Sequence, residues 1–89
     1  MLSNRQLFLL NTAQTSHTPR LIEIDRAEGV YLYGPNGEKY IDLVSGFAVS
    51  NIGHRHPRVL QAIANQLDKF LHVTVYGEFI QAPQVALAT

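Results

Sequence analysis

The sequence predicts an α+β chain: a short N-terminal helix, a three-stranded antiparallel β-meander, and then an amphipathic helix. Three observations lead to this prediction: a capping pattern at Ser3, three β-suited runs separated by turn residues, and a helical apolar periodicity after Pro57. The chain has 89 residues, of which 46% are hydrophobic and 16% charged, a globular composition. A domain this small buries only roughly 60–65% of the surface that its unfolded chain exposes, so we expect a thin core.

Residues 1–19 are expected to form a helix followed by a polar arm. Ser3, with Gln6 three positions later, fits a capping box that opens a helix of about two turns. The short apolar face of this helix consists of Leu7, Phe8 and Leu10. Residues 11–19 are small and polar and hydrogen-bond locally instead of joining a ladder, which predicts an arm.

The predicted meander has strands at residues 21–26, 30–33 and 39–44, all rich in Ile, Val, Leu and Tyr. Residues 27–29 separate the first two strands. The turn Gly34-Pro35-Asn36-Gly37 separates the second and third, with Pro35 pre-setting φ at its second position. Ser45-Gly46 then breaks the pattern, and an irregular stretch of small and apolar residues follows as far as residue 56.

The second helix is expected to start at Pro57, where the missing N–H of proline costs nothing. Its apolar face consists of Val59, Leu60, Ile63, Leu67, Phe70 and Leu71. We group residues 20–72 as one β-meander-plus-helix region. Residues 73–89 are expected to begin a connection, first extended and then helical from Ile80. Since that last helix stops without a glycine cap, the sequence predicts a chain that is cut rather than finished.

Charge and composition exclude several classes of partner and setting. Seven basic and seven acidic residues balance, without a basic cluster, so we expect neither nucleic acid nor a membrane surface as a partner. The N-terminus lacks a signal-peptide pattern, and no stretch approaches about 18 apolar residues. A cytoplasmic location is therefore expected. The absence of cysteine rules out disulfides and thiolate metal sites.

The side chains that could carry chemistry favour structural interpretations. His54 and His56 make half of a metal site, because no third ligand stands at helical spacing, so no metal is predicted. Ser45 lacks the setting of a catalytic nucleophile. Asp42 and Glu38 flank a strand and are expected to be solvated or to cap turns.

The run GVYLYGPNGEKYIDLVSGFAV from Gly29 to Val49, followed by NIGHRHP from Asn51 to Pro57, resembles class III aminotransferases. These are the acetylornithine, ornithine and 4-aminobutyrate group. The likeness continues into the helix after Pro57 and covers nearly the whole chain from about Thr18. Each block alone is a weak signal, but their order and spacing together are specific.

The resemblance implies the N-terminal part of the small domain of a fold type I enzyme that uses pyridoxal 5'-phosphate. It implies a homodimer with active sites at the subunit interface, and amino acid and 2-oxo acid substrates. Phe47 matches a loop residue on the substrate side of the cofactor, although it has no hydroxyl for a polar contact. Tyr76 and Phe79 belong to a stretch that reaches the partner subunit's site.

No catalytic or cofactor-binding residue is assigned to this chain. The family's chemistry needs a lysine Schiff base and an acidic partner of the pyridine nitrogen. The resemblance places both beyond Thr89, and neither Lys39 nor Lys69 matches the lysine. We expect the 89-residue chain alone to be inactive and not to bind the cofactor.

Two alternatives stay open from the sequence. The first is another enzyme of this type, such as a mutase, racemase or decarboxylase. The second is a free-standing interaction module that binds a partner through residues 47–52. The enzyme-fragment hypothesis predicts exposed apolar surface and self-association, whereas the module predicts a cooperative monomer.

Overall fold

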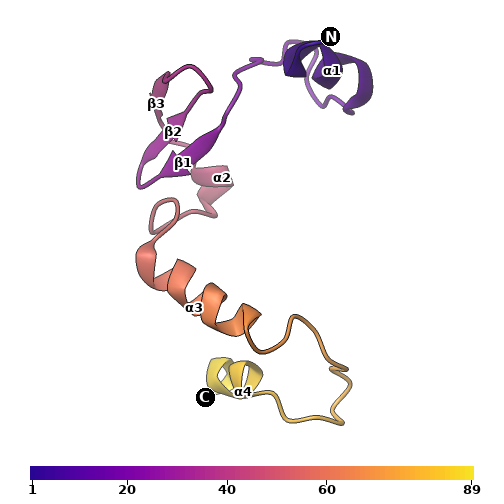
Figure 1. Ribbon diagram of the computed structural model, residues 1–89, viewed down its shortest axis with the longest axis vertical. Helices are drawn as coiled ribbons and strands as arrows, with labels where there is room; N and C mark the ends of the chain where they lie inside the picture. The colour runs from indigo at the N-terminus through magenta and orange to yellow at the C-terminus, as the bar shows by residue number, and fades with distance from the viewer. The chain divides into compact units, whose positions relative to one another are not determined.

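The computed structural model describes all residues from Met1 to Thr89, in two units, residues 1–56 and 57–89. The first unit contains α1 (Asn4–Asn11), β1 (Arg26–Glu28), β2 (Tyr31–Tyr33), β3 (Lys39–Ile41) and α2 (Ser45–Ala48). The second contains α3 (Pro57–Leu67) and α4 (Ala82–Ala88). Figure 1 shows these elements along the chain. The protein is therefore α+β, as predicted.

The capping box at the N-terminus is confirmed. The Ser3 hydroxyl accepts a hydrogen bond from the Gln6 amide at 3.3 Å, and the Gln6 side-chain oxygen accepts one from the Ser3 amide at 2.9 Å. These two bonds satisfy donors that a helix start otherwise leaves unpaired. Helix α1 therefore begins where the local sequence predicts it.

The three strands form an antiparallel meander in the order β1-β2-β3, also as predicted. The turn between β2 and β3 is closed by the Gly34 amide, which donates to the Glu38 carbonyl at 2.9 Å. The Glu38 carboxylate accepts the Asn36 amide at 2.9 Å. Hydrogen bonds from the backbone amides of Glu38 and Asn36 lower the pKa of this carboxyl. Glu38 thus caps a turn.

The predicted bounds of the outer strands were wrong. The first strand runs from Arg26 to Glu28, not over residues 21–26, because Arg26 pairs with Tyr33 and Glu28 with Tyr31. The expected separator at residues 27–29 is thus mostly strand, and the chain turns at Gly29, with φ 58°, and Val30. The third strand ends at Ile41 instead of Val44, because the Asp42 side chain accepts hydrogen bonds from the Val44 and Ser45 amides.

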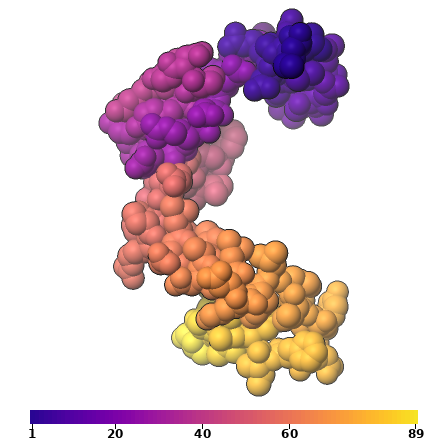
Figure 2. All heavy atoms as spheres, viewed as in Figure 1, coloured from indigo at the N-terminus to yellow at the C-terminus, as the bar shows by residue number.

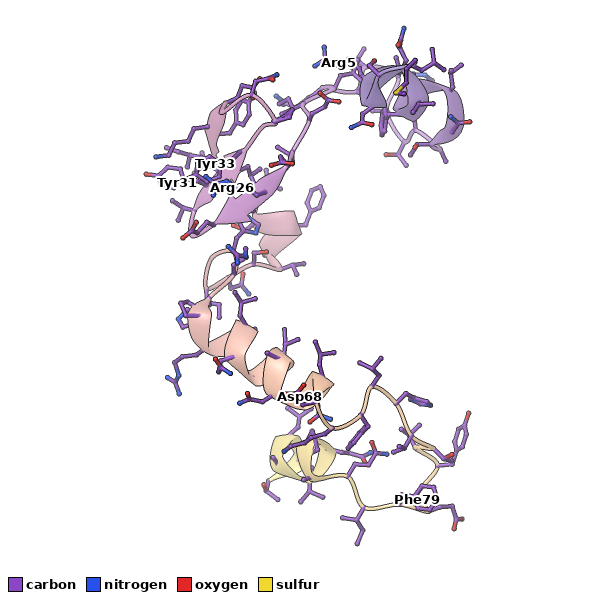
Figure 3. The ribbon with its side chains drawn as sticks, in the orientation of Figure 1. Arg5, Arg26, Tyr31, Tyr33, Asp68 and Phe79 are labelled. Atoms are coloured by element: carbon purple, nitrogen blue, oxygen red, sulfur yellow. The ribbon has the colours of Figure 1, made fainter.

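One face of the sheet carries stacked cations and rings (Figure 3). The Arg26 guanidinium carbon lies 3.7 Å from the centre of the Tyr33 ring. The Lys39 ammonium lies 3.9 Å from the centre of the Tyr31 ring. Such pairs contribute roughly 0.5–1 kcal/mol each at exposed sites. They join all three strands through side chains.

In the second unit, Pro57 occupies the first position of α3, as the sequence predicts. Phe70 and Leu71 follow the end of this helix instead of extending its apolar face. Helix α4 has proline in its first turn, close to the predicted start. None of the helices combines the length and apolar character needed to cross a lipid bilayer.

No apolar side chain of the chain is buried. The accessible surface is 8154 Å². A folded monomer of 9.9 kDa should expose about 5,200 Å², so roughly 3,000 Å² of surface remains uncovered. Figure 2 shows the atoms of the first unit in indigo to magenta and those of the second in orange to yellow. The sequence predicted a thin core, and the chain alone has no buried apolar core.

Candidate functional site

The candidate site is the connection after the sheet, residues 42–54, which we call the tied loop. Its first residue is fixed because the Asp42 amide donates to the Val30 carbonyl at 2.8 Å. Its last residue is fixed by a two-way backbone bridge: the His54 amide donates to the Gly29 carbonyl at 2.7 Å, and the Gly29 amide donates to the His54 carbonyl at 3.0 Å. Both ends are thus anchored to the first turn of the meander.

A side-chain pair joins the two ends of the tied loop. One carboxylate oxygen of Asp42, Oδ2, lies 2.6 Å from His54 Nε2. Because an ionised carboxylate can only accept, the imidazole N–H donates. The side chains are only 10% exposed for Asp42 and 21% for His54. The bond is short and charge-assisted, the stronger class of hydrogen bond.

The other carboxylate oxygen of Asp42 organises the backbone that follows. Oδ1 accepts the Ser45 amide at 2.9 Å and the Val44 amide at 3.2 Å. The hydrogen bond from His54 and then that from the Ser45 amide lower the pKa of Asp42. Since both oxygens are engaged, Asp42 serves as a turn cap, which was one of the two roles expected for it.

A close backbone approach explains the glycine at position 53. Gly53 has a φ of 84°, and a Cβ built there would stand 3.0 Å from the Gly29 carbonyl oxygen. Both the dihedral and the contact disfavour a side chain. The bridge between Gly29 and His54 therefore depends on glycine at this position.

The turn α2, expected to be irregular, is left-handed. The φ angles of Ser45, Gly46, Phe47 and Ala48 are 54°, 64°, 61° and 64°. A left-handed backbone costs an L-residue roughly 1–2 kcal/mol, and consecutive examples are rare. Such strain persists only where the surroundings impose it, and it clusters at functional sites. At the tip of this turn, Phe47 is 91% exposed.

A small hollow of about 100 Å³ lies beside the pair and is lined by Gly29, Val30, Asp42, Ser45, Ser50, Asn51, Gly53 and His54. A larger open groove of about 820 Å³ in the first unit is bordered by Asp42, Leu43 and Val44 of the tied loop. Its apolar lining includes Phe8, Leu21, Ile22, Ile24, Leu32 and Ile41. The chain gathers no group of three or more side chains that could hold a metal ion.

The other two predicted site residues, Tyr76 and Phe79, lie in the second unit, on the loop between α3 and α4. Their side chains are 87% and 60% exposed. Phe79 projects from this loop in Figure 3. One side-chain hydrogen bond spans the loop, from Gln81 Nε2 to the Thr74 carbonyl at 3.3 Å. The predicted site residues are thus divided between the two units.

The pairing of Asp42 with His54 was not predicted from the sequence. There the aspartate was considered with Glu38 and the histidine with His56, each beside its nearest similar neighbour. The available signals were an acidic residue at a strand end and a histidine after a glycine. Neither signal says that two side chains 12 positions apart will meet.

Comparison with known proteins gives consistent similarities. A sequence profile described as aminotransferase class-III matches residues 12–89. Ornithine aminotransferase of Brevibacillus brevis is 46% identical over 54 residues, which are 61% of this chain and 14% of that protein. Acetylornithine aminotransferase of Archaeoglobus fulgidus is 37% identical over 73 residues, which are 82% of this chain and 19% of that protein.

A solved structure has the same arrangement of elements. The taurine:2-oxoglutarate aminotransferase of Bifidobacterium kashiwanohense, in complex with PLP and glutamate, superposes with a TM-score of 0.79 and 27% identity. The match covers 92% of this chain and 18% of that protein. The chain thus spans a fifth or less of the length of these relatives.

Proposed function

This chain belongs to the class-III aminotransferase family, and we propose that it is the N-terminal part of a PLP-dependent aminotransferase of fold type I. The whole enzyme would move an amino group between an amino acid or ω-amino acid and a 2-oxo acid. The observation that carries the proposal is the family match over residues 12–89, which includes the tied loop. Relatives named for ornithine, acetylornithine and taurine suggest donors with a second functional group.

The residues of this chain do not by themselves fit covalently held PLP. Such a cofactor needs a lysine whose amine is available and a polar cradle for its phosphate. The Lys39 amine lies over the Tyr31 ring at 3.9 Å. Lys69 follows the end of α3 and is not among the residues that line the small hollow beside the pair. We therefore place the cofactor on residues of the whole enzyme that lie outside this chain.

The proposed contribution of the chain is a wall of the substrate pocket. Phe47, held out by the left-handed turn, would line the substrate side. Tyr76 and Phe79 would reach the active site of a partner subunit in a homodimer. An aromatic wall without a hydroxyl contributes shape and apolar contact, so it would favour the aliphatic part of a donor.

The uncovered surface supports the remaining parts of the proposal. Obligate interfaces take roughly 1,000–2,500 Å² from each partner, and the excess of roughly 3,000 Å² exposed on this one chain is more than one such interface would cover. We propose that the rest of the enzyme and its partner subunit cover this surface. Within that enzyme, residues 1–19 would be an arm, residues 20–72 part of the small domain, and residues 73–89 the start of the connection to the cofactor domain.

The test uses the full-length enzyme with ornithine and N-acetylornithine as donors and 2-oxoglutarate as acceptor. We expect glutamate to form in proportion to donor consumed. Lys39→Arg should retain this activity, because Lys39 is not assigned to the cofactor. Release of CO₂ or racemisation of the donor without glutamate formation would instead favour the decarboxylase or racemase alternative.

The interaction-module alternative is tested on the 89-residue chain itself. Sedimentation at several concentrations should reveal self-association through the uncovered apolar surface. A cooperatively folded chain that stays monomeric throughout would favour a free-standing module.

A further inference from the structure

We propose that Asp42 and His54 form a positioning pair, which holds the left-handed turn Ser45–Ala48 and so fixes Phe47 at the substrate wall. This inference rests on the proposed function for the role of Phe47. The geometry of the pair itself stands independently of that role. Neither residue would touch the substrate.

The Asp42–His54 pair couples the ends of the tied loop to its tip. The backbone bridge to Gly29 fixes only residue 54, and the bond to Val30 fixes only residue 42. The Asp42 carboxylate adds a link between the ends of the loop and the turn. One oxygen is bonded to His54 and the other to the amide of Ser45, where the left-handed turn begins.

The left-handed turn needs such a restraint. Three of its four residues are not glycine, and all have positive φ. Residues in this conformation return to negative φ when nothing holds them. The bonds inside the turn, from the Ala48 amide to the Val44 carbonyl and from the Val49 amide to the Ser45 carbonyl, close it but do not orient it. Its orientation comes from the fixed Ser45 amide.

Phe47 depends on the backbone of this turn for its position. With 91% of its surface exposed, this side chain is not fixed by packing within the chain. The backbone of the turn therefore sets where its Cα–Cβ bond points. A wall residue that is no longer held in place loses contact with the bound donor in the ground state and the transition state alike, so the restraint should act on the KM for the donor.

The experiment compares His54→Ala, His54→Asn and His54→Gln in the full-length enzyme. Alanine removes the bond, and asparagine is too short to reach Asp42. Glutamine places an N–H near the original Nε2 and should rescue. For the first two variants we expect the KM for the amino donor to rise about tenfold while kcat changes less than about twofold. Glu38→Gln, a matched change at another turn-capping carboxylate, should leave both parameters unchanged.

A second measurement follows the order of the turn independently of catalysis. These 89 residues contain no tryptophan, so Phe47→Trp adds one reporter to this chain, and the enzyme without the substitution, measured in parallel, gives the signal of any tryptophan elsewhere. The reporter's fluorescence anisotropy should fall when His54→Ala or His54→Asn is added and should recover with His54→Gln. If wild-type enzyme transfers no amino group, the proposed function fails, and the anisotropy still decides whether the pair orders the turn.

The inference is overturned by either of two results. One is unchanged KM and unchanged anisotropy in both His54→Ala and His54→Asn. The other is a loss of kcat and melting temperature together, with KM unchanged and no rescue by glutamine, because that pattern marks a purely structural role. If His54→Ala does not fold, His54→Asn and His54→Gln decide by the same criteria.

Discussion

The tied loop and the loop between α3 and α4 both present predicted site aromatics, but they are held in different ways. The tied loop has a backbone bridge at one end, a backbone bond at the other, and the Asp42–His54 pair between them. The second loop is spanned by a single side-chain bond, from Gln81 to Thr74. Tyr76 and Phe47 are nevertheless almost equally exposed, at 87% and 91%.

The difference shows that exposure alone does not tell which aromatic residue is positioned. In the tied loop, bonds between distant residues impose a left-handed backbone that the local sequence would avoid. The second loop carries no comparable set of ties. The tied loop is thus the preformed part of the proposed pocket, and we propose that the second loop is ordered by contacts made on assembly.

The largest expected loss of stability comes from Gly53→Ala, which disrupts the backbone bridge between Gly29 and His54. The new Cβ would meet the Gly29 carbonyl oxygen at 3.0 Å while its backbone keeps a φ of 84°. We expect a cost of about 3 kcal/mol, seen as faster hydrogen exchange of the Gly29 and His54 amides. Gly37→Ala is the control, because its φ is 86° but no atom lies within 4 Å of the new Cβ. Equal effects at residues 29 and 54 from both variants would contradict the close-approach explanation.

Acid should also release the tied loop. The pKa of Asp42 is lowered from its usual 3.8, first by the His54 hydrogen bond. The unfolded state therefore binds the proton more tightly, and the stabilisation is fully present above the unfolded pKa. It is lost as the pH falls through the lowered, folded-state pKa. In full-length Phe47→Trp enzyme, anisotropy should stay constant down to about pH 4 and drop below it. Persistence of the same step in an Asp42→Asn background would exclude Asp42 as its source.

Ala48→Gly is expected to stabilise the turn, a smaller effect than that of Gly53→Ala and of opposite sign. Residue 48 is left-handed at φ 64°, so glycine should stabilise the turn by about 1 kcal/mol. Exchange of the Val49 amide, which donates to Ser45, measures this change. Ala62→Gly inside α3 should instead destabilise its helix by about 1 kcal/mol. Destabilisation by both substitutions would show that the turn is not strained.

The smallest effect is expected from Gln81→Ala in the second loop. An exposed hydrogen bond contributes at most about 1 kcal/mol, so cleavage of the full-length enzyme by chymotrypsin at Tyr76 should accelerate less than about fivefold. Gln84→Ala, in α4, is the matched control and should leave the rate unchanged. An effect on the second loop as large as that of Gly53→Ala on the tied loop would remove the contrast between them.

Much of the fold was predictable because its signals are local. The Ser3 capping box, the Gly34–Gly37 turn and Pro57 at a helix start each depend on residues within one turn of each other. The bounds of β1 were not predictable, since Leu21, Ile22 and Ile24 suit a strand as well as Ala27 does. Pairing with Tyr31 and Tyr33 decided between them.

By itself, the sequence determined the order of the elements, the family, and the identity of the aromatic residues proposed for the site. Only the tertiary structure decided that Asp42 meets His54, that Gly53 lies against Gly29, and that Ser45 to Ala48 turn left-handed. The physical reason is separation along the chain. Helix caps and turns are formed by neighbours, whereas the strain that presents Phe47 is maintained by hydrogen bonds between residues that meet only after the chain has folded back on itself.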